Sequence, residues 1–237
     1  MKTNFNKLIL SILFLANIGL VSCKNEIDNY ISPEGGISGT IYDAETKEPI
    51  QLPVQGAAGV LVNLFEQNTG ASKSIDFRAN QDGTYQNAKV FNGDYKVVVN
   101  GPFVNKCEGN TRINGQTTLD LSAVPFSRIS IDAVISADNN ITINYKVDKT
   151  DSKFVLSNVS VMWNFAPRVD INNSNYAAIS SKGAVASGSQ LFELSKSAVF
   201  TGNIYKIKAN GNKIYVRVCA KVNDAVNYSK VLELSVN

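Results

Sequence analysis

Apolar and polar residues alternate over short segments along most of the chain. Three of these segments, residues 37–41, 60–64 and 95–99, place small or apolar side chains at every second position. A period of two predicts β-strands with one buried face. The segments are separated by turn dipeptides that tolerate positive φ, such as Asn92-Gly93 and Asn114-Gly115. No segment after residue 22 shows helical periodicity, so the pattern predicts an all-β fold.

The N-terminal residues follow a different pattern. Lys2 and Lys7 precede a mostly apolar run, residues 8–20, which leads directly into Val21-Ser22-Cys23. This run has 13 residues, whereas a membrane-spanning helix needs about 20. The pattern therefore predicts an export signal that is removed from the mature protein.

The segment Leu20-Val21-Ser22-Cys23 resembles the lipobox of bacterial lipoproteins. This resemblance implies cleavage after residue 22 and acylation of Cys23, which makes the membrane a partner through a lipid anchor. Glu26 and Asp28 resemble a surface-export signal, which favours the cell surface of the outer membrane over its periplasmic face. The alternative is an ordinary secretory signal in which Cys23 is coincidental.

Charge narrows the possible partners. The chain has 23 Lys and Arg residues against 20 Asp and Glu residues, and a net charge of +3. No cluster of basic residues supplies the positive face that a dedicated nucleic-acid binder needs. Nucleic acid is therefore not expected as a partner.

Histidine is absent from the sequence. Its absence excludes Ser-His-Asp and Cys-His catalysis and the zinc-hydrolase signatures. A glycosidase needs only two carboxylates that face each other across a cleft, and Asp43, Glu45 and Glu48 are close in sequence. We interpret these three acids as solvating a turn before Pro49. The sequence therefore predicts no catalytic residue, no cofactor and no enzymatic activity.

Two cysteines follow Cys23, and they fall in different halves of the chain. We expect Cys107 and Cys219 to be unpaired thiols, and a disulfide that crosses between domains is the alternative. Their spacing does not match a metal site, so no metal site is expected.

The strand pattern divides the rest of the chain into two domains. Residues 23–33 are read as a polar tether, and a boundary is expected near Pro125, where a new alternating series begins. We therefore expect a first domain over residues 34–124 and a second over residues 125–237. Each is expected to be an antiparallel β-sandwich.

Both domains resemble known sandwich types. The first is similar to the transthyretin-like sandwich of carboxypeptidase regulatory domains, and the similarity lies in residues 36–43, 46–50, 60–64, 81–85 and 91–99. The second resembles an immunoglobulin or fibronectin type III-like sandwich, with strands at 141–147, 159–163, 214–220 and 231–236. Val216, Val218 and Ala220 are expected to point inward, and Trp163 is expected in the core.

Signal, lipobox and two sandwiches together resemble an uncharacterised two-domain lipoprotein family of the Bacteroidetes outer membrane. Members of that family are associated with polysaccharide-uptake systems of the starch-utilisation type. The resemblance implies glycan handling by association, because no sugar-binding residue is carried over from it.

The predicted recognition loop is residues 164–175, which follow the Trp163 strand and precede Tyr176. Its candidate ligand-binding residues combine rings with polar groups, and they are Phe165, Arg168, Asn172, Asn173 and Tyr176. Sugars stack their C–H faces on aromatic rings while amides and charged groups bond their hydroxyls. The alternative is a solvated connection without a ligand.

These patterns together predict a surface-anchored, non-catalytic lipoprotein that binds glycan or assists a polysaccharide-uptake complex. The alternative is a structural or protein-interaction accessory subunit, or an adhesin-like spacer. The expected partners are the membrane, a polysaccharide and an outer-membrane transporter complex.

Overall fold

A computed structural model describes residues 31–236 of the chain. The predicted signal (residues 1–22), the predicted lipidation residue Cys23 and residues 24–30 of the tether lie outside the described residues. Both predicted domains fall within one compact unit that begins at Pro33. No helix within residues 31–236 is long and apolar enough to cross a membrane.

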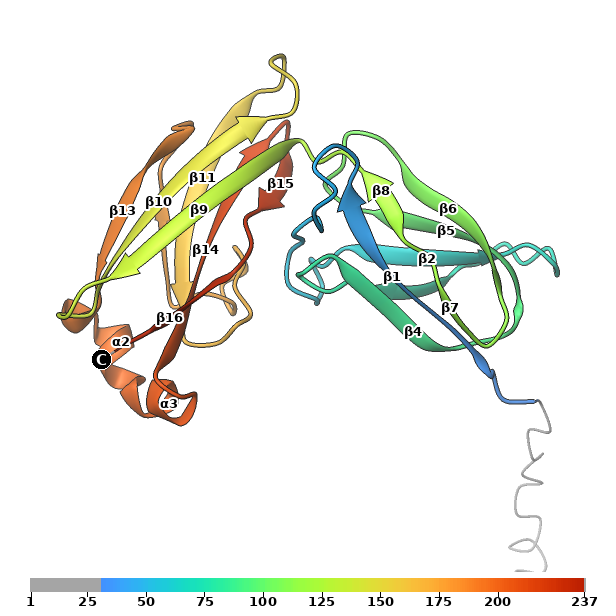
Figure 1. Ribbon diagram of the computed structural model, residues 1–237, viewed down its shortest axis with the longest axis horizontal. Coiled ribbons are helices and arrows are strands. Elements are labelled where there is room, and N and C mark those ends of the chain that lie inside the picture. Colours follow the sequence, from blue (N-terminus) through green and yellow to red (C-terminus); the bar gives the residue numbers. More distant parts are fainter. Residues whose placement is uncertain (1–30, 237) are drawn as a thin grey trace, which may run out of the picture. The chain divides into compact units, whose positions relative to one another are not determined.

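Two four-stranded sheets form the first sandwich (Figure 1). One contains β1 (Gly35–Asp43), β4 (Thr84–Val90), β7 (Gln116–Thr118) and β8 (Leu121–Ala123). The other has the order β3-β2-β5-β6 and contains β2 (Leu61–Glu66), β3 (Ile75–Arg78), β5 (Gly93–Asn100) and β6 (Cys107–Ile113). Within the first sheet β1 pairs antiparallel with β4 and parallel with β7 and β8. These parallel pairs depart from the expected antiparallel pattern. After β6 the chain crosses from the opposite sheet, and β7 and β8 then run alongside β1 in the same direction.

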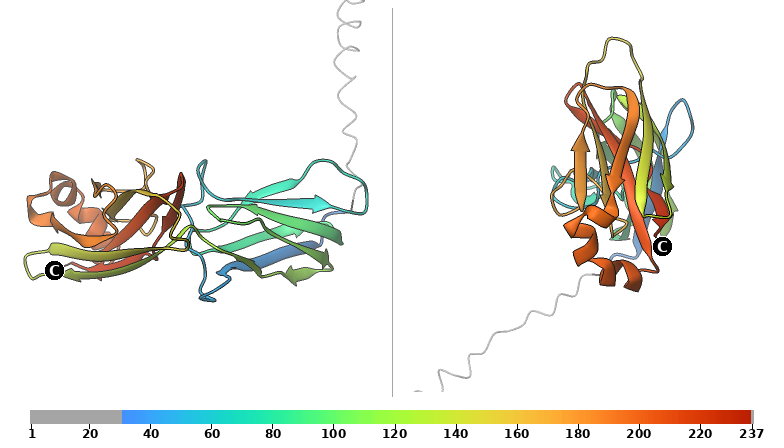
Figure 2. Two further views of the ribbon diagram at one scale, coloured as in Figure 1. Left: turned by 90° about the horizontal axis from the view of Figure 1, so that it is seen from above. Right: turned by 90° about the vertical axis from the view of Figure 1, so that its left-hand side faces the viewer.

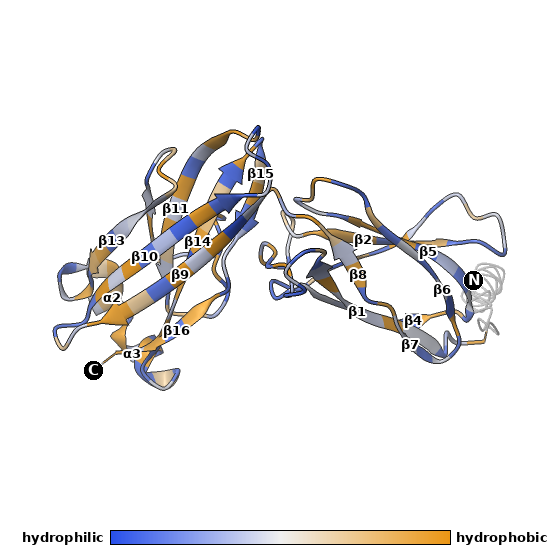
Figure 3. Cartoon of the chain, turned by 45° about the horizontal axis from the view of Figure 1, so that its top comes forward, coloured by the Kyte–Doolittle hydropathy of each residue, from blue (hydrophilic) through white to orange (hydrophobic). Residues whose placement is uncertain are grey.

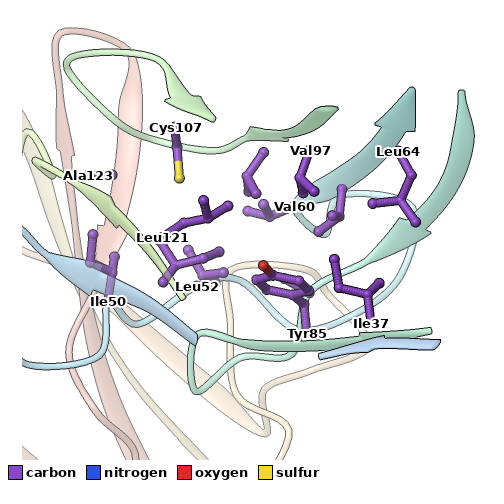
Figure 4. Packing of buried hydrophobic residues seen from close by; sticks show 14 of the residues in the cluster. Ile37, Ile50, Leu52, Val60, Leu64, Tyr85, Val97, Cys107, Leu121 and Ala123 are labelled. Carbon is purple, nitrogen blue, oxygen red and sulfur yellow. The ribbon is translucent and has the colours of Figure 1, made fainter. Parts of the chain in front are cut away.

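The period-two residues meet between these sheets. Figure 4 shows Ile37 and Tyr85 of one sheet facing Leu64 and Val97 of the other, and all four are buried. Burying an aliphatic or aromatic side chain of this size contributes roughly 1.5–3 kcal/mol relative to exposure, so this core supplies much of the domain's stability.

The second sandwich is also built from two sheets. The three-stranded sheet has the order β13-β10-β9 and contains β9 (Ser127–Ile135), β10 (Asn140–Lys149) and β13 (Ser187–Glu193). The five-stranded sheet contains β11 (Leu156–Asn164), β12 (Ala178–Ser181), β14 (Lys213–Val222), β15 (Ala225–Tyr228) and β16 (Leu232–Ser235). Figure 3 shows hydrophobic and hydrophilic residues alternating along β9 and β10. The predicted all-β fold class with two sandwiches is confirmed.

Strand β14 is buried on both faces. Val216, Val218 and Ala220 point into the main core of the second sandwich together with Trp163, which is 1% exposed, so these predictions are confirmed. The opposite face of β14 carries Arg217, which is also fully buried. The sequence pattern does not predict that the Arg217 face of β14 is buried, because a charged residue in a strand normally marks a face exposed to solvent.

Both remaining cysteines are free and buried, one in each sandwich. Burial raises the pKa of the Cys107 thiol and of the Cys219 thiol to about 12. Because the thiolate is the reactive form, these side chains act as small core residues.

Three short helices follow β13: η1 (Leu194–Lys196), α2 (Ala198–Gly202) and α3 (Ile204–Ala209). They lie at one end of the second sandwich, where the C-terminus also lies (Figures 1 and 2). The expectation of a mature chain without helices is wrong at this point. Five or six residues are too few to display a 3.6-residue period, and the Ser197 hydroxyl that caps α2 by accepting from Phe200 N is a weak sequence signal.

Candidate functional site

The predicted recognition loop connects β11 to β12, and its centre is anchored by Asp170. This side chain is 2% exposed. One carboxylate oxygen accepts from Val54 N of the first sandwich at 2.9 Å. The other accepts from Asn172 N and Asn175 Nδ2, each at 2.9 Å. The middle of the loop is therefore part of the junction between the sandwiches.

Two more contacts fix the same loop to the first sandwich. Arg168 Nη2 donates to Gln55 O at 3.0 Å. Gln81 Nε2 donates to Pro167 O at 2.8 Å. Arg168, a predicted ligand-binding residue, thus has a structural partner.

The other polar candidates form local turn contacts. Asn172 Oδ1 accepts from Ser174 N at 3.2 Å, and Tyr176 OH donates to Asn173 Oδ1 at 2.9 Å. Tyr176 is half-buried and packs against the cluster of buried residues on the outer face of β14. The structure brings Asn173 and Tyr176 together, whereas Arg168 is directed to the first sandwich.

Arg217 lies at the centre of the junction. Its guanidinium donates to Val169 O and Ser229 O in the second sandwich and to Leu52 O in the first, each at 2.8 Å. The guanidinium carbon lies 4.5 Å from the centre of the Tyr228 ring, a cation–π contact. Burial lowers the pKa of Arg217 to about 10, so the side chain stays charged at neutral pH.

A second charged contact across the junction involves Asp43, which was expected to solvate a turn. That expectation is wrong, because Asp43 is 4% exposed and its two oxygens accept from Arg128 Nε at 2.6 Å and Nη2 at 2.8 Å. Burial alone would raise the pKa of Asp43, but the hydrogen bonds from Arg128 and from Glu45 N outweigh it and hold the pKa below its ordinary value.

The Asp43–Arg128 pair predicts a pH-dependent contribution to stability. Since the pKa of Asp43 is lower in the folded protein, the pair stabilises the fold above the unfolded-state pKa of about 3.9, and this stabilisation disappears as the pH falls through the folded-state pKa. Urea unfolding of wild type and Asp43→Asn should show a stability difference at pH 6 that shrinks on acidification below about pH 4. Exposed Asp132, replaced by Asn, is the control. A difference that is constant down to pH 2.5 would contradict the ion-pair explanation.

Two grooves flank the junction. The larger has a volume of about 560 Å³ and is lined by residues that include Asp43, Thr46, Glu48, Arg128 and Lys230. The smaller, of about 410 Å³, is mainly apolar and includes Pro53, Pro102 and Ile171. Asp43 and Glu48 are the two acids in the larger groove. Because Arg128 engages both Asp43 oxygens, that carboxylate is neither a free nucleophile nor a proton donor.

A different surface combines one exposed ring and one half-buried ring with a cation at the helical end of the second sandwich. Tyr205 on α3 is 66% exposed. The ammonium of Lys206 lies 5.6 Å from the centre of the Tyr205 ring and 5.1 Å from the centre of the Phe165 ring. We call Phe165, Tyr205 and Lys206 the aromatic surface.

Local structure positions both sides of the aromatic surface. Asn164 begins the predicted loop and Phe165 follows it. The buried side chain of Asn164 fixes this start: Oδ1 accepts from Phe165 N at 2.9 Å and Nδ2 donates to Arg168 O at 3.0 Å. Phe165 packs its half-buried ring against the core. The sequence pattern indicates Phe165 but not Tyr205 and Lys206, because it does not predict their helix.

The fold thus defines a two-domain β-sandwich protein whose domains share buried polar contacts. Two family models match it: the N-terminal domain of a protein of unknown function, DUF3823, over residues 35–124, and a domain of unknown function, DUF3823_C, over residues 127–233. The chain belongs to the DUF3823 family, which confirms the predicted membership of an uncharacterised two-domain family. No curated protein matches the chain.

Several solved structures share the fold. A DUF3823 family protein from Parabacteroides merdae is 23% identical, with a TM-score of 0.69. One from Bacteroides uniformis is 19% identical, also with a TM-score of 0.69. A second B. uniformis structure, described as "a putative carbohydrate binding protein", is 16% identical with a TM-score of 0.66. Each match covers 86% of this chain and 100% of the other.

Proposed function

We propose that this chain is a lipoprotein, anchored at the cell surface through Cys23, that binds glycan without catalysis or assists a polysaccharide-uptake complex in doing so. The observation that carries the binding function is the aromatic surface, where the exposed Tyr205 ring lies beside Lys206 and Phe165. An exposed ring offers an apolar platform for the C–H face of a sugar, and the ammonium supplies hydrogen-bond donors to its oxygens.

Two further observations support this proposal. A relative that shares the fold is described as "a putative carbohydrate binding protein". Tyr205 and Lys206 of the aromatic surface also lie on α3, whereas the junction contacts are made by Arg168, Asp170 and Arg217. A ligand can therefore bind there without disturbing the contacts between the sandwiches.

The expected effect of Tyr205→Ala is a loss of glycan affinity of about tenfold, which corresponds to about 1.4 kcal/mol. Loss of the ring removes the stacking platform, whereas Lys206 remains. Affinity electrophoresis in gels that contain a panel of polysaccharides measures the change. The matched control is Phe91→Ala, which removes another exposed ring, 52% exposed, from the first sandwich. No retention by any polysaccharide, or equal retention of both variants and wild type, would refute glycan binding at this surface.

A structural role as an accessory subunit is the second candidate, and the edge strand β13 favours it. Leu191 on this strand is 52% exposed, and β13 pairs with β10 on one side only. An open edge with an apolar side chain is a template for pairing with another chain. Co-purification from detergent-solubilised membranes distinguishes the two candidate functions, since an accessory subunit should co-purify with its transporter. A Leu191→Lys variant of such a subunit should no longer co-purify.

A further inference from the structure

The helical end of the second sandwich carries more positive than negative charge. The sequence from residue 194 to residue 223 contains lysines and an arginine but no aspartate or glutamate. Three of the lysines in this segment pair with neighbouring acids: Lys196 with Glu193 at 2.6 Å, Lys213 with Glu233 at 2.7 Å and Lys221 with Asp224 at 2.9 Å. The positive charge that is left on this end comes from the helix α3.

That helix carries Lys206 and Lys208, and both are exposed. Neither forms an ion pair with an acid anywhere in residues 31–236. The aromatic surface therefore combines a ring platform with uncompensated positive charge. A neutral sugar would leave that charge unused, whereas an acidic sugar would complement it.

The position of Lys206 makes this complementarity specific. Its ammonium lies 5.1 Å from the centre of the Phe165 ring and 5.6 Å from the centre of the Tyr205 ring. An ammonium has three N–H donors and no acceptor, so its natural partner is an anionic oxygen. A sugar that stacks on Tyr205 and carries a carboxylate can place that group against Lys206.

We propose that the aromatic surface selects acidic polysaccharides and that a hexuronate carboxylate pairs with Lys206. This inference rests on the glycan-binding function proposed above and names its ligand class. An anionic lipid surface has related chemistry, but helices that lie in a membrane interface present a long apolar face. The helices here have five and six residues, which favours a saccharide.

The test compares two polymers that share one backbone: polygalacturonate, and polygalacturonate whose carboxylates are fully methyl-esterified. The protein is the chain from Lys24 onward, made without the signal segment and therefore without an acyl anchor. Wild type should bind the free acid about fivefold more tightly than the ester, the effect of one exposed ion pair. The preference should fall as salt is raised, because exposed charges are screened.

Variants assign the preference to one residue. Lys206→Gln should bind both polymers equally, and Lys206→Arg should keep the preference because it keeps the charge. Lys196→Gln is the matched control, since Lys196 is on the same end but already paired with Glu193. A preference that persists in Lys206→Gln would overturn the inference.

The other outcomes separate the inference from the function on which it rests. Equal binding of both polymers by wild type, weakened by Tyr205→Ala, would overturn the acid preference and leave glycan binding in place. Absence of binding to every polysaccharide would overturn both. Binding to phosphatidylglycerol vesicles that Lys206→Gln abolishes, without binding to polygalacturonate, would overturn the inference in favour of a membrane-contacting surface.

Discussion

Replacing Arg217 with methionine is expected to lower the free energy of unfolding by about 3 kcal/mol, because breaking a buried charged network costs several kcal/mol. Methionine keeps much of the apolar volume but removes every donor. The carbonyls of Leu52, Val169 and Ser229 would each lose a partner within the junction. The buried carboxylate of Asp170 would also lose its neighbouring positive charge.

Denaturation with guanidinium chloride measures this loss of unfolding free energy. The variant should also unfold in two separate transitions, since Leu52 belongs to the first sandwich and Arg217 to the second. Arg112→Met is the matched control, because the Arg112 side chain is 79% exposed on β6. A variant at Arg217 that is as stable as this control would mean that the buried guanidinium does not hold the sandwiches together.

Gly39→Ala is expected to destabilise the first sandwich by about 3 kcal/mol, at the upper end of the usual cost of overpacking. A Cβ at Gly39 would lie 1.9 Å from the carbonyl oxygen of Leu119, a backbone atom that cannot rotate away. It would also lie 2.8 Å from the Tyr85 hydroxyl, which donates to that same carbonyl. The chain at Leu119 would have to move away from β1.

The melting temperatures of Gly39→Ala and Gly202→Ala, measured by thermal unfolding, are compared with that of the wild type. Gly202 ends α2, and a Cβ there would meet no atom within 4 Å. The Gly202 variant should keep the wild-type melting temperature within about 2 °C, as expected for a surface change. Equal melting temperatures for the two variants would contradict the close approach of Leu119 to β1.

The period-two pattern was sufficient to predict the two sandwiches, because it reports which face of each strand is buried. Val216, Val218 and Ala220 are found inward for this reason. The pattern could not identify Arg217, since the carbonyls that accept from it come from loops spread along the sequence: those of Leu52, Gln81, Val169 and Ser229. It likewise placed Gly39 on the buried face without indicating that the neighbouring backbone requires a residue with no side chain.

The candidate loop shows where sequence reasoning reached its limit. Asp170 has the sequence features of a turn residue, and its contacts with Asn172 and Asn175 fit that interpretation. Its contact with Val54, 116 positions away, depends on the packing of one sandwich on the other. Tyr205 was overlooked because α3 is too short to show a period. The lack of acids between Glu193 and Asp224 was a visible signal that could have directed attention to this segment.

The most direct test of glycan binding at the aromatic surface is an NMR titration of the ¹⁵N-labelled chain with galacturonate oligosaccharides. The expected result is that amide shifts change on α3 (residues 204–209) and at Phe165, and that they stay constant around Asp43, Thr46 and Lys230 in the larger junction groove. Shift changes confined to that groove, or no changes at millimolar ligand, would contradict it.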